Sequence, residues 1–327
     1  MGVLSVRYKQ KSLLSYGLIL ISIAILGSGI STIFPSILIC YIISGFGAAM
    51  IMPMTTSLVA KHVPLQKRTG TLGILMATMS LSYLIGTPII SMISDYGGWR
   101  FPFLVYALPF PVLGILLVIK GLPLEPESEQ LLNKGGLLDG YRGIMSNRSA
   151  IACLLGGAFS SAAFTGITLY AASFYREVFI LSRSSATYII VGASLSYTIG
   201  AIVSGKFVNR YGRKTITCST ALIAGVLTLS FTVISNLWAS LIVLIFGCLF
   251  SGMRATAIMS LTLEQVPEFR GSMMSVSAAS EYLGAALGSF LGGLAILYFS
   301  YYAIGPLLGL VGIIAPIIIY LYGVDII

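Results

Sequence analysis

Two charged side chains lie deep inside apolar segments, and their types make them the first candidates for chemistry. Arg254 falls in the apolar run 238–263 and Glu281 in the run 271–297. Each lies about ten residues from one end of its run, roughly 15 Å along a helix. An ionisable group at that depth in a bilayer costs a few kcal/mol and is normally paired or faces water. The two residues are therefore either a substrate or proton site, or a structural ion pair between packed helices.

The sequence offers little material for an enzyme. Its one histidine, His62, follows Lys61 at the end of an apolar run, where we expect an ordinary loop residue. No cluster of histidine, cysteine and carboxylate could bind a metal or form a nucleophilic triad. Gly45-Phe-Gly47 lies within an apolar run, whereas a phosphate loop follows a strand. We predict no catalytic residue, no metal and no cofactor.

Apolar segments make up most of the chain. Of its residues, 57% are hydrophobic and 9% are charged, whereas soluble domains carry about a quarter charged residues. Runs of about 20 apolar residues, long enough to cross a bilayer, follow one another with short polar breaks. We predict an all-α integral membrane protein with about ten transmembrane helices. The predicted spans are 12–31, 35–61, 69–94, 101–121, 149–177, 184–206, 214–234, 238–263, 271–297 and 301–322.

One polar break is much longer than the others and divides the chain. Residues 122–148 are predicted to form a linker between a four-helix bundle, 1–121, and a six-helix bundle, 149–327. If the N-terminus lies inside, most Lys and Arg residues fall in inside loops, and the net charge of +9 follows from that bias. We therefore predict a cytoplasmic linker and cytoplasmic N- and C-termini, and no nucleic-acid partner.

The two predicted bundles carry matching residues at one constant offset, which indicates an internal repeat in parallel orientation. The matched residues are Gly2 with Gly205, Arg7-Tyr8 with Arg210-Tyr211, Lys11 with Lys214, and Pro64 with Pro267.

The second occurrence resembles the loop signature of the major facilitator superfamily, G-x-x-x-D-R-x-G-R-K. Its residues are Gly205, Asn209, Arg210, Gly212, Arg213 and Lys214, with Asn209 in place of the usual acid. The first occurrence keeps Gly2, Arg7 and Lys11 in a degraded form. Gly86-Thr-Pro88, together with a stripe of small residues at Gly284, Gly288 and Gly292, resembles the drug- and sugar-efflux branch.

This resemblance implies a two-bundle helical fold and a function. Family members have twelve helices, with the signature after helices 2 and 8, so the ten spans correspond to helices 3–12. The N-terminal bundle is then incomplete, because helices 1 and 2 are missing. The implied function is a secondary active transporter, a proton-coupled antiporter that exports a small molecule across the plasma membrane by alternating access. The alternative is a non-transporting remnant or an accessory membrane protein.

The resemblance also implies partners and roles for particular residues. The partners are a small-molecule substrate, with protons as the candidate coupling ion, and the lipid bilayer around a monomer. Glu281, Arg254 and Tyr170 are the candidates for the substrate or proton site, although Tyr170 fits helix packing equally well. The glycine stripe is predicted to pack helices. The basic signature residues are expected to act as a cytoplasmic latch against carboxylates and helix C-termini, to orient the chain by their charge, or to do both.

Overall fold

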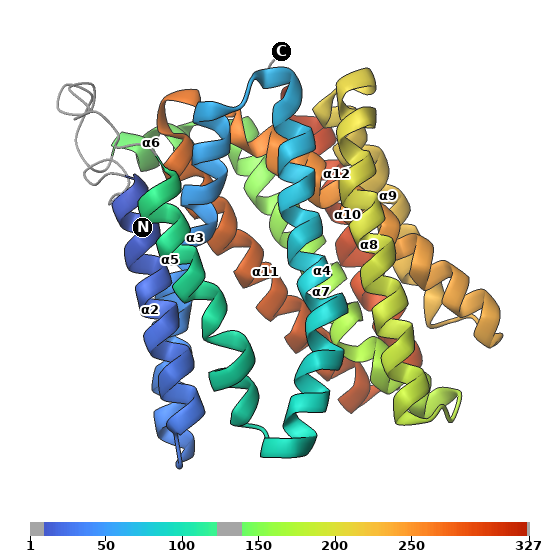
Figure 1. Cartoon of the computed structure of the whole chain (residues 1–327). Helices are drawn as coiled ribbons and strands as arrows, with labels where there is room; N and C mark the ends of the chain where they lie inside the picture. Colours follow the sequence, from blue (N-terminus) through green and yellow to red (C-terminus); the bar gives the residue numbers. More distant parts are fainter. Residues whose placement is uncertain (1–9, 123–138, 326–327) are drawn as a thin grey trace. The chain divides into compact units, whose positions relative to one another are not determined.

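The computed structural model describes residues 10–122 and 139–325, and every predicted span is helical there (Figure 1). By length and composition, ten helices in these ranges could cross a membrane, which confirms the predicted all-α membrane fold. The long helices are α2 (Gln10–Ile30), α3 (Phe34–His62), α4 (Leu65–Gly97), α5 (Pro109–Gly121), α7 (Arg148–Val178), α8 (Arg183–Tyr211), α9 (Arg213–Phe231), α10 (Leu237–Leu263), α11 (Arg270–Tyr298) and α12 (Ile304–Tyr322).

Polar residues in the predicted breaks begin several of these helices. The Asn147 side-chain oxygen accepts hydrogen bonds from the backbone N–H groups of Ser149 (2.9 Å) and Ala150 (3.1 Å) at the start of α7. Asn236 caps α10 in the same way through Ala239. These side chains satisfy donors that the first turn of a helix leaves unpaired.

Two local features depart from the sequence prediction. The predicted fourth span begins with a π-helix, Phe103–Ala107, in which the Leu108 N–H donates to the Phe103 carbonyl. Pro109 has no N–H to continue an α-helix, so the wider turn precedes it. The second feature is α6 (Asp139–Ser146), a short helix inside the predicted linker. Residues 123–138 of that linker lie outside the described residues.

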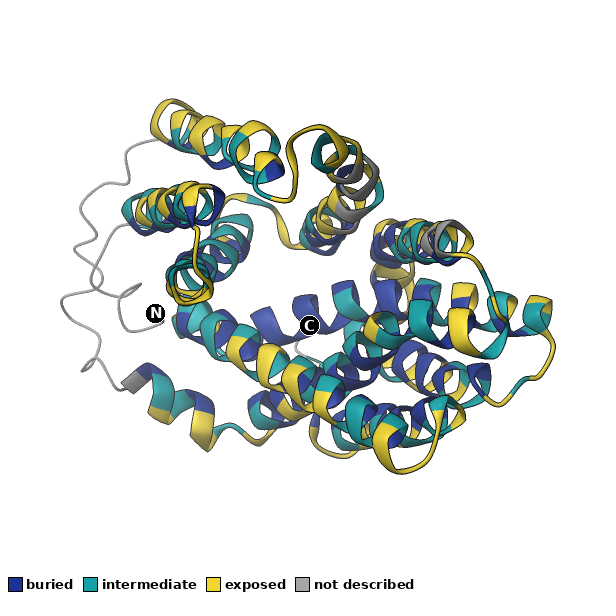
Figure 2. Cartoon of the chain, turned by 90° about the horizontal axis from the view of Figure 1, so that it is seen from below, coloured by how far each residue is buried: buried dark blue, intermediate teal, exposed yellow. Residues whose placement is uncertain are grey.

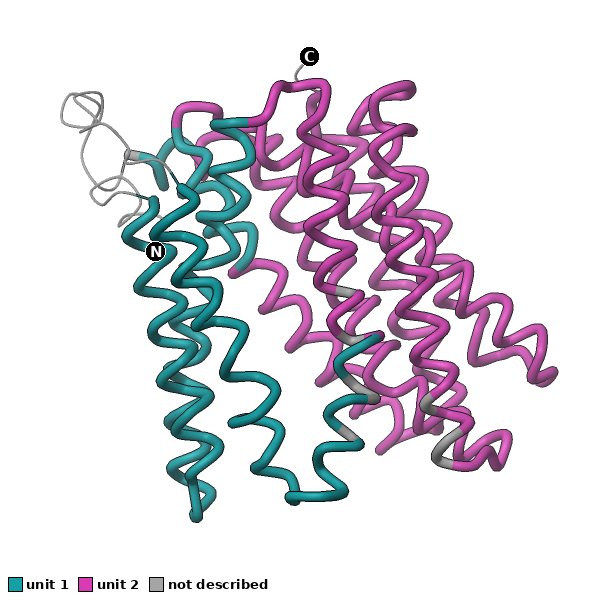
Figure 3. Tube along the Cα trace, viewed as in Figure 1, with its two compact units in different colours: residues 1–62, 85–143, 269–278 teal, residues 63–84, 144–268, 279–327 magenta. Residues whose placement is uncertain are grey.

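The chain groups into two compact units, coloured separately in Figure 3. Unit 1 comprises residues 1–62, 85–143 and 269–278, and unit 2 comprises residues 63–84, 144–268 and 279–327. The first part of α4 thus belongs with the later helices, and the start of α11 belongs with the earlier ones. The predicted division into a bundle 1–121 and a bundle 149–327, joined by the linker 122–148, remains a prediction.

In unit 1, small residues let α2 approach α3. A Cβ atom at Gly47 would come within 2.8 Å of the Gly17 carbonyl oxygen, which is closer than real Cβ contacts. The C-terminal end of α2 is also fixed, because Arg100 Nε donates to the Ser31 carbonyl at 2.7 Å. The Arg100 guanidinium lies over the Trp99 ring, 4.4 Å from its centroid.

Unit 2 has an aromatic core between α7, α9 and α12. Phe174 and Phe231 meet edge to face at 5.3 Å, and both pack with fully buried Leu308. Exposed positions recur along the helices, as the yellow residues in Figure 2 show. Many of these exposed residues are Leu, Ile and Phe. Such surfaces suit contact with lipid rather than water.

The glycine stripe packs α11 against α7, as predicted. A Cβ atom at Gly284 would overlap the Ala158 carbonyl, and one at Gly288 would overlap the Ala162 carbonyl. Backbones can approach this closely only where the side chain is absent.

We expect Gly288→Ala to lower the free energy of unfolding by about 1–3 kcal/mol, because the added methyl group must push α11 away from α7. The matched control is Gly192→Ala in α8, where a Cβ atom would meet nothing within 4 Å. The control should be neutral or stabilising by up to about 1 kcal/mol, since alanine favours helix. Chemical denaturation in detergent measures both variants, and equal effects would contradict the packing role.

Candidate functional site

Arg254 is buried where α8 and α10 touch. A Cβ atom at Gly252 would overlap the Tyr197 carbonyl, and one at Gly200 would overlap the Leu249 carbonyl. Two residues after Gly252, the Arg254 side chain is only 6% exposed. The close helix contact therefore holds a permanent cation in the interior of unit 2.

Glu281 reaches the same region from α11. A Cβ atom at Gly157 of α7 would lie 3.6 Å from Glu281 Cγ and 3.7 Å from its Oε1. The same position lies 3.7 Å from the Ile258 side chain, and Ile258 follows Arg254 by one turn of α10. The Glu281 carboxyl group thus lies over a glycine, where the absence of a side chain leaves it room.

Arg254 and Glu281 lie within electrostatic range of each other. Within the described part of unit 2, however, no hydrogen bond or ion pair joins them. The Tyr197 side chain lies within electrostatic range of both. The sequence predicted the depth of the two charges but did not identify Tyr197. When a carboxylate and a guanidinium are close without direct contact, the carboxylate can bind a proton or a donor group of a third molecule, and the guanidinium can donate to an acceptor group.

Tyr170, the third candidate, has a partner in the helix packing. Its hydroxyl donates to the Ser289 carbonyl at 2.8 Å, and its ring covers Gly292. These contacts support the packing interpretation, and a contact with substrate stays a prediction.

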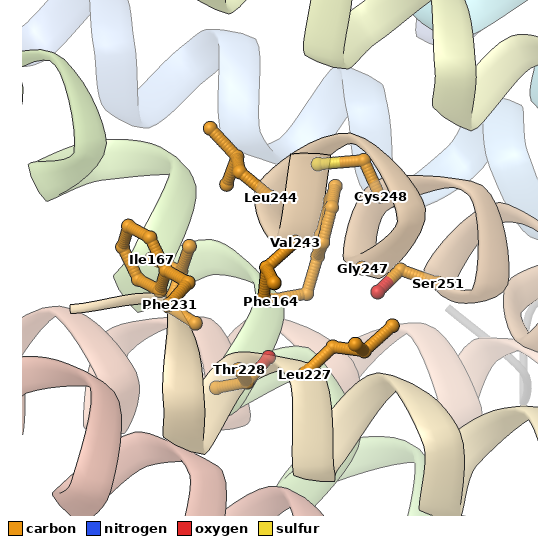
Figure 4. A pocket seen from close by; sticks show the side chains of 10 residues that line it. All are labelled: Phe164, Ile167, Leu227, Thr228, Phe231, Val243, Leu244, Gly247, Cys248 and Ser251. Atoms are coloured by element: carbon orange, nitrogen blue, oxygen red, sulfur yellow. The ribbon is translucent and has the colours of Figure 1, made fainter. Parts of the chain in front are cut away.

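A shallow hollow lies between α7, α9 and α10, and Figure 4 shows its lining. Its empty volume of about 250 Å³ includes space open to the outside, and ligand sites usually measure about 300–1,000 Å³. The lining is apolar except for Thr228, Cys248 and Ser251, and it contains none of the predicted site residues. The hollow is therefore not the candidate site.

The signature residues Gly205 and Asn209 join α8 to the start of α4. A Cβ atom at Gly205 would lie 2.9 Å from the Gly70 Cα atom, so the two helices meet at glycines. The Asn209 amide donates to the Gln66 carbonyl at 3.0 Å. A carboxylate has no proton to donate in this way, so Asn209 makes a contact that the usual acid could not make.

Gly212 and Lys214 start α9 against the end of the chain. Gly212 has a φ of +87°, which favours glycine, and it precedes α9 without a capping side chain. Asp325 supplies the acceptor instead, because its Oδ2 accepts from the Lys214 N–H at 3.1 Å. Arg210 lies 5.3 Å from the Tyr211 ring centroid, and Arg213 begins α9.

Lys11 makes a related contact in unit 1. Its Nζ donates to the carbonyls of Ile119 (2.8 Å) and Leu122 (2.6 Å) at the end of α5. A cation at a helix C-terminus is electrostatically favourable. The Lys11 cation thus lies at a helix end, whereas Lys214 makes its contact with Asp325 through the backbone N–H, and the latch remains a prediction. Gly2 and Arg7 lie outside the described residues.

Replacing Asp325 with alanine should lower the free energy of unfolding by about 1 kcal/mol, the usual loss when a helix cap is removed. Asp325→Asn is the matched control, since the amide oxygen can still accept from the Lys214 N–H. It should cost only a few tenths of a kcal/mol through the lost charge. If chemical denaturation shows the same loss for both variants, the capping role is wrong.

Sequence reasoning did not identify an ion pair between α4 and the end of α10. Arg68 Nη1 lies 2.6 Å from Glu264 Oε1, and the two side chains are 15% and 9% exposed. Next to it, the hydroxyls of Thr69 and Ser260 share a hydrogen bond of 2.8 Å. No local sequence pattern pairs positions so far apart in the chain.

Gln265, the next residue, joins three chain segments. Its carboxamide donates to the Val324 carbonyl and accepts from the Ser149 hydroxyl, and its own carbonyl accepts from Asn147. The start of α7, the end of α10 and the segment after α12 are thus tied together inside unit 2.

The sequence model of the Major Facilitator Superfamily matches residues 1–182 and again residues 153–325. The uncharacterised MFS-type transporter YtbD of Bacillus subtilis is 25% identical over 257 residues, covering 77% of this chain and 63% of its own length. Multidrug resistance protein 2 of Bacillus subtilis is 23% identical over 300 residues, covering 88% of this chain and 73% of that protein.

A solved structure shows the same fold. The fucose:proton symporter FucP of E. coli aligns with a TM-score of 0.80 at 15% identity, covering 99% of this chain and 86% of FucP. The two overlapping family matches also agree with the internal repeat. The helices repeat likewise, since α2 and α9 begin 203 residues apart, as do α3 and α10.

Proposed function

Because the chain belongs to the Major Facilitator Superfamily, we propose that it is a secondary active transporter that exports a small molecule in exchange for protons by alternating access. The observation that carries the proposal is the placement of one carboxyl group and one guanidinium in the interior of unit 2. Glu281 lies over Gly157, and Arg254 is 6% exposed. Charged groups so deep in a membrane protein usually serve transport or relay.

Glu281 supplies a site that can hold and release a proton. As a carboxylate it balances the charge of Arg254 within electrostatic range. When a proton binds a carboxylate oxygen, Glu281 can no longer attract a cationic or donor group of the substrate, so the proton and the substrate exclude each other. Export of substrate and entry of protons would then be linked through competition for one site.

One relative supports export, and one solved structure supports coupling to protons. Multidrug resistance protein 2 is named for drug resistance, which favours export. FucP is named as a fucose:proton symporter, which favours coupling to protons. We further propose that the chain lies in the plasma membrane with both termini in the cytoplasm. The crowding of Lys and Arg at one set of helix ends supports this orientation.

The proposal is tested with the purified chain in proteoliposomes. Ethidium, a lipophilic cation, should accumulate when the interior is acidic, because protons leaving the vesicle drive it inward. Fucose serves as the second probe, and its accumulation under an acidic exterior would indicate symport and overturn the export direction. If an imposed proton gradient moves neither compound above the rate of empty liposomes, the transporter assignment fails. That result would favour the alternative, a non-transporting remnant or an accessory membrane protein.

A further inference from the structure

Tyr197 is held in place beside the two interior charges. Its ring stacks on Phe164 of α7, with centroids 5.0 Å apart and an interplanar angle of 29°. Its backbone carbonyl is in close contact with Gly252 of α10. The ring therefore packs against α7, while the backbone of Tyr197, which belongs to α8, contacts α10.

The ionisable groups around Tyr197 come from neighbouring helices. Arg254 and Cys248 of α10 and Glu281 of α11 lie within electrostatic range of Tyr197. Arg254 in turn interacts with Tyr197 and Glu281. In the described residues, none of the side chains of Tyr197, Arg254 and Glu281 makes a hydrogen bond or ion pair. The phenol is thus a polar group with free capacity next to both charges.

The chemistry of a phenol suits a position near both charges. A guanidinium can only donate hydrogen bonds and a carboxylate can only accept them, whereas a phenol hydroxyl does both. A phenol hydroxyl within reach of both groups could therefore accept from Arg254 and donate to Glu281 at the same time. A phenylalanine could fill the same space but could make neither bond.

We propose that Tyr197 is a positioning residue of the Glu281–Arg254 site, whose hydroxyl links the guanidinium to the carboxyl group and makes the protonation of Glu281 depend on Arg254. This inference rests on the proposed function for its biological meaning. Its physical content, a hydroxyl that couples two charges, can be tested without any transported compound.

The test is a pH titration of the purified protein in lipid, followed by infrared spectroscopy of the protonated carboxyl band. Glu281→Gln identifies which part of that band belongs to Glu281. Tyr197→Phe keeps the ring, its stacking on Phe164 and nearly all of its volume, so the variant is expected to fold. Loss of the hydroxyl should move the midpoint of the Glu281 band by about one pH unit, a tenfold change in proton affinity.

The matched control is Tyr188→Phe on the same helix, where the ring is 75% exposed. This variant should leave the Glu281 band unchanged. Repeating Tyr197→Phe in an Arg254→Gln background tests the link, because the shift should shrink when the guanidinium is gone. An unmoved midpoint in Tyr197→Phe, or the same shift in both backgrounds, would overturn the inference. If the shift appears but Glu281→Gln still transports normally, the proposed function fails and the role of Tyr197 stands.

Discussion

Glu281→Gln should abolish proton-driven movement of the probe compound, because glutamine keeps the shape of the side chain but cannot bind and release a proton. Stability should fall by less than the roughly 3–5 kcal/mol that breaking a buried ion pair costs. The reason is that, in the described part of the chain, Glu281 and Arg254 interact at a distance rather than through a direct pair. Proteoliposome transport and chemical denaturation measure the two effects.

A double variant separates function from structure. Glu281→Leu with Arg254→Leu removes both charges, so it should fold at least as well as either single variant and still not transport. Glu177→Gln is the control, since Glu177 lies exposed near the end of α7, and it should transport normally. A double variant that transports with unchanged pH dependence would refute the site.

Arg68→Gln and Glu264→Gln should each lower the free energy of unfolding by about 3 kcal/mol. Each change leaves the partner charge in a site where the side chains are only 15% and 9% exposed. Arg68→Gln also removes the hydrogen bond from Arg68 Nε to the Val63 carbonyl at 2.9 Å. Chemical denaturation in detergent measures each variant.

The double variant should lose less than the sum of the two single losses, since the pair is already broken after the first change. Lys67→Gln is the control, because this neighbouring lysine is exposed and should change stability by less than about 0.5 kcal/mol. Strictly additive losses, or single losses as small as that of the control, would show that the pair contributes no coupling.

The spans could be predicted because a helix that crosses the bilayer needs about 20 consecutive apolar residues. The caps at Asn147 and Asn236 lay in polar breaks, where an amide side chain suits a helix start. The depths of Arg254 and Glu281 followed from their distance to the span ends. The packing of Gly284 and Gly288 followed from their spacing of four residues along one helix face.

Other features needed the three-dimensional arrangement. Arg68 and Glu264 lie on helices far apart in sequence, and nothing local indicates that α4 meets α10. The position of Tyr197 depends on how α8 is rotated, and an apolar helix surrounded by apolar neighbours has little periodicity to reveal its rotation. The π-helix before Pro109 could not be predicted from hydropathy. A hydropathy profile reflects how apolar the side chains are and not which residue lacks a backbone N–H group.

Cysteine labelling tests directly whether the site of Glu281 opens alternately to the two sides of the membrane, and it needs no known substrate. The four free cysteines, Cys40, Cys153, Cys218 and Cys248, are replaced with alanine, and Glu281→Cys is added. An impermeant cationic methanethiosulfonate is then applied from either side of oriented membrane vesicles, with Leu308→Cys in the fully buried core as the unreactive control. We predict that the cysteine at position 281 reacts from both sides. Reaction from one side only, or from neither, would contradict alternating access at this site.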